Sequence, residues 1–217
     1  MCDHANPRLS LRLRLVTLGA RPPSRRLGAD RVLVKSVYAP LALGWVAARF
    51  DPQVVLVLRH PLNVVASWVE LGWGGCALET NPAVRRRLAH WGPPDLGPHP
   101  TPLQRVAFEV GLFTCELEGW RARRPDWAVA EHEALCLDPA GGFRALAARV
   151  GLGWSDRAEL FLEESNQPGA GYSLYRVAAE QPGRWRRRLS AGQVREAWSV
   201  LRRFEAPWVE RLGAELE

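Results

Sequence analysis

The sequence VVLVLRHPLNVVAS, residues 54–67, carries the pattern from which the fold is predicted. Its first five residues are continuously apolar, which is typical of a parallel strand that is covered on both faces. Pro61 then suits the first turn of a helix, because a residue at that position has no backbone hydrogen bond to lose. The stretch therefore predicts a strand that passes directly into a helix, with Arg59 at the carboxyl end of the strand. Ligands of α/β proteins bind at this end.

Elements on both sides of this stretch predict an α/β domain, in which a largely parallel sheet is flanked by helices. Further strands are expected over residues 9–16, 31–35 and 127–131, and further helices over residues 38–50, 103–123, 139–150 and 190–213. Residues 91–102 hold five prolines and two glycines, so we expect a long exposed loop there. Residues 1–30 are expected to form a basic arm or strand, and residues 31–217 one domain.

The positive charge of the chain is concentrated at its N-terminal end. The 217 residues carry a formal net charge of +6, but residues 1–31 alone hold seven arginines against two aspartates. Residues 32–217 hold 22 basic and 21 acidic side chains and are nearly neutral. A nearly neutral body does not call for a nucleic-acid partner. A membrane span is not expected either, because no apolar stretch approaches the ~20 residues that one requires.

The cysteines and histidines give no sign of a metal or of an oxidising compartment. The four cysteines, at positions 2, 76, 115 and 136, share no CxxC spacing, and no secretory leader with an apolar segment is found. We therefore expect a cytoplasmic protein. The histidines at positions 60, 90, 99 and 132 are too scattered for metal-ligand spacing, so no metal is expected.

Arg59 and Ser67 form a candidate binding pair. Ser67 lies less than two turns into the predicted helix, so its hydroxyl can face back toward the end of the strand. An arginine fork binds two oxygens of one phosphate group, and a hydroxyl supplies a further donor. The N-terminus of the helix would add a partial positive charge. The pair predicts a phosphate site.

Residues 54–68 resemble the strand and helix that hold the 3′-phosphate of the cofactor in sulfotransferases that use 3′-phosphoadenosine 5′-phosphosulfate (PAPS). Residues 33–50 resemble the family's preceding strand and helix, including its lysine. Residues 129–139 resemble a later strand, in which His132 replaces the usual tyrosine, and residues 183–189, GRWRRRL, resemble the family's Gly-x-Trp-basic segment. The four segments follow the family's order over roughly residues 31–205. The resemblance implies a P-loop nucleotide-hydrolase-like sulfotransferase fold.

The resemblance also implies a role for each matching residue. Arg59 and Ser67 would hold the 3′-phosphate of PAPS, and Arg184 matches a basic residue that contacts this co-substrate. Lys35 matches a lysine that approaches the transferred sulfuryl group in some members, which makes it the candidate catalytic residue. The implied reaction moves a sulfuryl group from PAPS to a hydroxyl or amine of a small-molecule, carbohydrate or peptide acceptor, without a metal.

Two parts of the family's machinery have no counterpart in the sequence. The 5′-phosphosulfate loop of the family is a glycine-containing turn whose backbone N–H groups and basic side chain stabilise charge during transfer. Before Lys35 the nearest turn, residues 19–23, has prolines where free N–H groups are needed. Val37 stands where cytosolic members carry a histidine base. The chain thus resembles a sulfotransferase that is incomplete at its N-terminus, which leaves enzymatic activity open.

Two alternatives remain open beside the sulfotransferase interpretation. One is a truncated or non-catalytic homologue that keeps only the 3′-phosphate site. The other is an arginine-rich nucleic-acid-binding module, whose binding would fall steeply with salt and would ignore adenosine 3′,5′-bisphosphate.

Several charged side chains near the candidate site are expected to be solvated. These are the arginine triplets at residues 85–87 and 186–188 and the acids Glu131 and Glu133, which flank the end of the strand predicted over residues 127–131.

Overall fold

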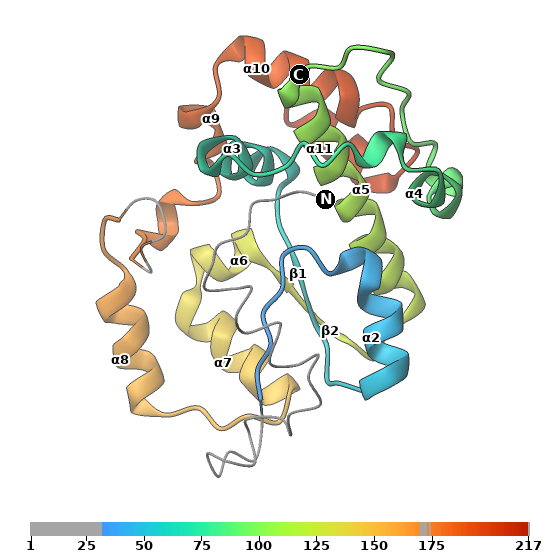
Figure 1. Cartoon of the computed structure of the whole chain (residues 1–217). Coiled ribbons are helices and arrows are strands. Elements are labelled where there is room, and N and C mark those ends of the chain that lie inside the picture. Colours follow the sequence, from blue (N-terminus) through green and yellow to red (C-terminus); the bar gives the residue numbers. More distant parts are fainter. Residues whose placement is uncertain (1–31, 170–172, 174, 217) are drawn as a thin grey trace. The chain divides into compact units, whose positions relative to one another are not determined.

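The structure is a computed structural model that describes residues 32–169, 173 and 175–216. The described residues fall into two units that divide between Ala39 and Pro40. Residues 32–39 belong to the first unit and contain no helix or strand. All described helices and strands belong to the second unit (Figure 1). The strand expected over residues 9–16, and the arm expected over residues 1–30, lie outside the described residues.

The second unit is mostly helical, and its described residues contain one small sheet. Its elements in chain order, with η for a 3-10 helix, are η2 (Pro40–Ala42), α2 (Leu43–Phe50), β1 (Val55–Leu58), α3 (Pro61–Leu71), η3 (Leu78–Thr80), α4 (Pro82–Arg87), η4 (Ala89–Trp91), α5 (Pro102–Arg123), β2 (Ala128–Glu131), α6 (His132–Leu137), α7 (Pro139–Arg149), α8 (Asp156–Ser165), η5 (Ala178–Glu180), α9 (Trp185–Arg188), α10 (Ala191–Leu201) and α11 (Pro207–Ala214).

The strands β1 and β2 pair in parallel, from Val55 opposite Ala128 to Leu58 opposite Glu131. Both strands are therefore found where the sequence predicts them, and their parallel pairing agrees with an α/β arrangement. Because the ladder is parallel, the carboxyl ends of both strands lie at the same edge of the sheet. Arg59 and α3 follow one strand at this edge, and α6 follows the other.

The strand expected over residues 31–35 is not formed by its described part. Residues 32–36 have no strand geometry, and the side chains of Val32, Leu33 and Val34 are 60%, 85% and 84% exposed. A β-branched run becomes a strand only when a neighbouring strand pairs with it and covers its side chains. Residues 32–36 have no such pairing, so the prediction from the apolar run was wrong.

The single helix expected over residues 190–213 is two helices, α10 and α11. Ser190 does cap α10, as expected, through a capping box with Gln193. The break comes at Ala206, which is extended, with φ −143° and ψ 143°, directly before Pro207. A residue before proline is pushed away from helical backbone angles, and proline then suits the first turn of the next helix.

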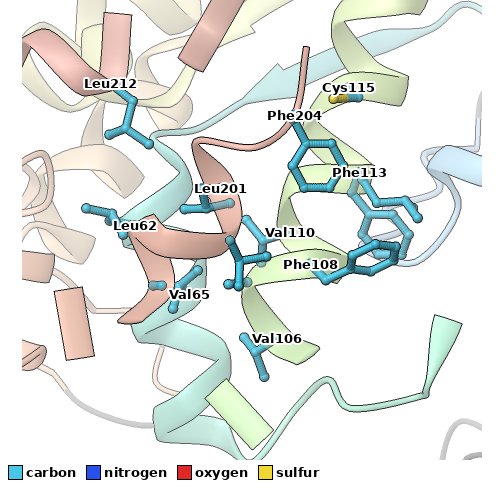
Figure 2. Close-up of a cluster of buried hydrophobic side chains, with 14 of the residues drawn as sticks. Leu62, Val65, Val106, Phe108, Val110, Phe113, Cys115, Leu201, Phe204 and Leu212 are labelled. Atoms are coloured by element: carbon cyan, nitrogen blue, oxygen red, sulfur yellow. The ribbon is translucent and has the colours of Figure 1, made fainter. Parts of the chain in front are cut away.

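The core forms around α5, which packs against α3, α10 and the segment that leads into α11 (Figure 2). Buried apolar side chains include Leu62, Val65, Phe108, Val110, Leu201 and Phe204. Gly111 of α5 lets the ring of Phe204 approach the helix backbone, because a Cβ atom at position 111 would collide with that ring. The tight packing of α3 on α5 fixes the helix that carries Ser67.

Candidate functional site

A cavity of about 650 Å³ lies at the carboxyl edge of the sheet. Its lining residues come from α3, α6, α7, α8, η5 and α9 and from the segments around η5. Four arginines contribute to the wall: Arg59, Arg176, Arg184 and Arg188. The largest apolar side chains of the wall are Leu71, Leu135, Phe143, Phe161 and Leu162. The wall thus combines four arginines and three glutamates, Glu70, Glu159 and Glu163, with apolar side chains from α3, α6, α7 and α8.

Arg59 is the residue that the sequence places at the mouth of β1, and it lines the cavity. Its Nε is buried and has no hydrogen-bond partner among the described residues. Burial lowers the pKa of the guanidinium and so opposes its charge; Glu133 raises this pKa, and Arg188 and Arg184 lower it. A buried donor without a partner is costly, so Arg59 is suited to an acceptor supplied by a ligand.

Ser67 reaches the same cavity from α3. Ser67, Glu70 and Leu71 all line it, and Asn63 precedes Ser67 by one helical turn. Residues three, four and eight positions apart share one face of a helix, which explains why these side chains are on the same side of α3. The spacing of Arg59 and Ser67 therefore does bring both residues to one cavity.

The basic segment around α9 supplies two further arginines of the cavity wall, Arg184 and Arg188. Arg184 donates from Nη1 to Oε1 of Gln181 (3.0 Å), and Arg188 forms an ion pair with Glu70 of α3. Arg184 and Arg188 are four residues apart, so helical geometry turns both toward α3.

The expectation that residues 186–188 are all solvated is wrong for Arg188. Its side chain is only 20% exposed, against 52% for Arg186 and 61% for Arg187. The sequence signal for this difference was that Arg184 and Arg188 are four residues apart, the spacing of one helical turn.

Glu133 is not a solvated surface acid. Its Oε1 accepts the backbone N–H of His60 (3.1 Å) and Nδ2 of Asn63 (3.1 Å), and it lies 3.5 Å from Nδ1 of His132. Burial acts to raise the pKa of Glu133, but the hydrogen bonds from His132, His60 and Asn63 outweigh it and lower the pKa to about 2. His60 is the N-cap residue of α3, so this carboxylate occupies the N-terminus that was expected to face a phosphate.

His60 and Asn63 have structural contacts that the sequence did not reveal. The His60 ring stacks on Trp185 (centroids 5.5 Å apart, planes at 11°), and its Nε2 lies 3.1 Å from Oε2 of Glu215. Burial lowers the pKa of His60, which favours the neutral ring. Asn63 is 2% exposed and binds the backbone of Pro182 and Trp185. The only sequence signal for Asn63 was an amide in the apolar first half of this helix.

Cys136 and His132 line the cavity beside Arg59. The Cys136 Sγ lies 3.7 Å from Nε2 and 3.8 Å from Nδ1 of His132. Burial raises the pKa of the Cys136 thiol, with a further contribution from Glu133. A neutral thiol is a poor nucleophile, so Cys136 contributes to the wall of the cavity rather than to a thiolate site.

Lys35 is not among the residues that line the cavity. It lies in the described part of the first unit, in exposed chain without secondary structure. Of the four site residues that the sequence predicts, three line one cavity, and Lys35 lies outside the unit that contains it.

Neither a metal centre nor a membrane span is found in the described part of the chain. Its His, Cys, Asp and Glu side chains form no group of three that could hold a metal ion. None of the described helices combines the length and the apolar composition that a bilayer crossing requires. Comparison with known proteins adds no relative: no protein-family model, no curated protein and no solved structure matches the chain.

Proposed function

We propose that the cavity binds a nucleotide through its ribose 3′-phosphate, and that the protein uses PAPS to transfer a sulfuryl group. The observation that carries this proposal is the buried, unpartnered Nε of Arg59 in a wall that also holds Ser67, Arg184 and Arg188. The P-loop-like sulfotransferase fold belongs to the same proposal.

The charge of the wall supports a multiply charged anion as the ligand. The positive charges of Arg188 and Arg184 lower the pKa of Arg59, so the guanidinium groups are close enough to repel one another. A phosphate group that accepts from two arginines would replace this repulsion with charge-assisted hydrogen bonds. Three glutamates of the wall, Glu70, Glu159 and Glu163, offset part of this charge; Glu70 pairs with Arg188 and Glu159 pairs with Arg144 outside the wall.

The apolar residues of the cavity wall support a nucleotide as the ligand in preference to a bare anion. Leucine and phenylalanine side chains of α6, α7 and α8 face the same volume as the arginines. Ligand sites typically combine a largely apolar wall with a few polar groups that fix orientation. A volume of about 650 Å³ lies within the usual range for a small organic ligand.

The transfer of the sulfuryl group would be a displacement at sulfur, in which the acceptor replaces the bridging oxygen. Arg59, Ser67 and Arg184 would hold the donor, the bond between sulfur and the bridging oxygen would break, and an acceptor oxygen or nitrogen would bond to sulfur. The acceptor's proton passes to solvent water, the bridging oxygen keeps the electron pair of the broken bond, and adenosine 3′,5′-bisphosphate is released. Lys35 would neutralise charge on the bridging oxygen. The acceptor would be a hydroxyl or amine of a small molecule, carbohydrate or peptide.

The first test is calorimetry with adenosine 3′,5′-bisphosphate and with adenosine 5′-monophosphate, which lacks the 3′-phosphate. We expect the bisphosphate to bind more tightly, and Arg59→Ala to weaken it roughly 10- to 100-fold, as for loss of a charged hydrogen bond. Arg186→Ala is the matched control, because it removes an arginine of α9 that does not line the cavity. Equal affinity of both nucleotides for the wild type would end the proposal.

A second candidate is a nucleotide-binding protein without transferase activity. It is favoured by the sequence before Lys35, in which no counterpart of the 5′-phosphosulfate loop is found. Release of adenosine 3′,5′-bisphosphate from PAPS, measured with hydroxyl and amine acceptors, distinguishes the two candidates. Binding of the bisphosphate without any turnover of PAPS would favour the non-catalytic protein. A nucleic-acid-binding module would instead bind oligonucleotides with a steep salt dependence and ignore the bisphosphate.

A further inference from the structure

Asn63 lies where three segments of the chain meet. Its side chain is 2% exposed and belongs to α3. Its Nδ2 donates to Oε1 of Glu133 in α6 (3.1 Å) and to the carbonyl oxygen of Pro182 (2.7 Å), while its Oδ1 accepts the backbone N–H of Trp185 (3.0 Å). All three segments contribute side chains to the cavity wall, although Asn63 itself does not line the cavity.

The arginines of the wall need such a junction, because their charges oppose their own arrangement. Arg184 and Arg188 both act against the charge of Arg59, in addition to the effect of its burial. A fixed backbone limits how far like-charged arginine side chains can separate, because each side chain then extends from a fixed point. Arg184 directly precedes Trp185, whose backbone N–H is bound by Asn63.

We propose that Asn63 is a positioning residue that holds the Pro182–Trp185 backbone against α3, so that Arg184 and Arg59 face a single anion. The inference rests on the proposed function to the extent that the cavity binds an anion. Asn63 does not line the cavity and acts through the Pro182–Trp185 backbone and the Glu133 carboxylate. Donors that are held in place before the ligand arrives bind it without a further ordering cost.

The loss of Asn63 has a specific structural consequence. In Asn63→Ala the Trp185 N–H and the Pro182 carbonyl lose their partner, and Glu133 loses one of its donors. Asn63→Asp keeps an acceptor for Trp185 but loses both donated hydrogen bonds, and it places a second carboxylate beside Glu133. The double variant Asn63→Asp with Glu133→Gln exchanges amide and carboxylate, and so restores the hydrogen bond between positions 63 and 133.

The experiment compares these variants with Thr101→Ala. Thr101 caps α5 through a capping box and does not line the cavity, so its loss weakens the fold without touching the arginines. Binding is measured with two probes, inorganic sulfate and adenosine 3′,5′-bisphosphate. Hydrogen exchange reports on the backbone amide of Trp185.

We expect Asn63→Ala to speed amide exchange at Trp185. Binding of both probes should weaken about tenfold, which corresponds to the loss of one charged hydrogen bond between Arg184 and the anion. Asn63→Asp should weaken binding similarly, and the double variant should regain part of the loss. Thr101→Ala should stay within about twofold of the wild type, since its contacts are remote. Should Asn63→Ala fail to fold, the comparison of Asn63→Asp with the double variant decides.

Three results would overturn the inference: unchanged exchange at Trp185 in Asn63→Ala, faster exchange with unchanged affinity for both probes, or a wild type that binds neither probe. A wild type that binds sulfate but not the bisphosphate would defeat the proposed function alone. The sulfate affinities of the variants would then decide the inference on Asn63.

Discussion

The change Glu109→Gln should alter how stability depends on pH. Glu109 of α5 is 1% exposed, and its Oε1 accepts the backbone N–H of Cys76 (2.6 Å). Burial raises the pKa of Glu109 to about 7 from an ordinary value of 4.5; the Cys76 hydrogen bond opposes this shift, and the nearby Glu79 adds to it. The folded protein therefore holds a proton on Glu109 over a range of pH in which the unfolded chain has released it.

The magnitude follows from the difference between the two pKa values. A pKa of about 7 against 4.5 corresponds to about 3 kcal/mol, at 1.36 kcal/mol per unit. Because the folded pKa is the higher one, the stabilising contribution of the protonated group is full below pH 4.5 and is lost as pH rises to about 7. Glutamine keeps the acceptor oxygen but cannot ionise, so Glu109→Gln should not show this loss.

The assay is urea unfolding of both proteins at intervals between pH 5 and pH 8. We expect the free energy of unfolding of Glu109→Gln, relative to the wild type, to rise by about 2–3 kcal/mol across this range. The lowered pKa of His60 affects both proteins equally, so its contribution cancels in the difference between their free energies of unfolding. Glu210→Gln, at an exposed position of α11, corrects for the loss of one acidic side chain. Parallel stability curves for wild type and Glu109→Gln would refute the reasoning.

Two further predictions concern packing and the acid range. Gly111→Ala should destabilise the protein by about 1–3 kcal/mol, because its Cβ would collide with the Phe204 ring. In Gly213→Ala of α11, the new Cβ meets only the Trp198 ring of α10 at ordinary contact distance, so the melting temperature should stay equal or rise. Equal effects of the two changes would contradict this account. Glu133, whose pKa is about 2, should contribute stability above pH 4.5 that is lost as pH falls toward 2. Glu133→Gln should flatten this loss in urea unfolding below pH 4.5, and an unchanged slope would count against the network around Glu133.

The local sequence predicted the candidate site better than it predicted the sheet. The segment that holds Arg59 and Ser67 needs only its own pattern, because an apolar run, a proline and a helical spacing fix where both side chains point. The segment over residues 31–35 also contains a β-branched apolar run, between Arg31 and Lys35, yet residues 32–36 form no strand. Pairing with a neighbouring strand is a property of distant parts of the chain, and composition cannot supply it.

The charged residues around the site show the same division. Glu133 and Arg188 looked like solvated side chains in sequence, since acids and arginine runs are mostly exposed. Their burial depends on partners far along the chain: Asn63 and His60 for Glu133, and Glu70 for Arg188. No local pattern encodes a contact between residues 70 and 118 positions apart.

The two strands, the helix that follows β1, and the positions of Arg59 after β1 and of Ser67 within α3 could be predicted from sequence alone, because these depend on backbone geometry over a few residues. Only the tertiary structure decided that Arg184 and Arg188 share a cavity with them, and that Asn63 joins the segments which carry these groups. The physical reason is that packing of α3 on α5 and long-range hydrogen bonds choose among the many arrangements that the local preferences permit.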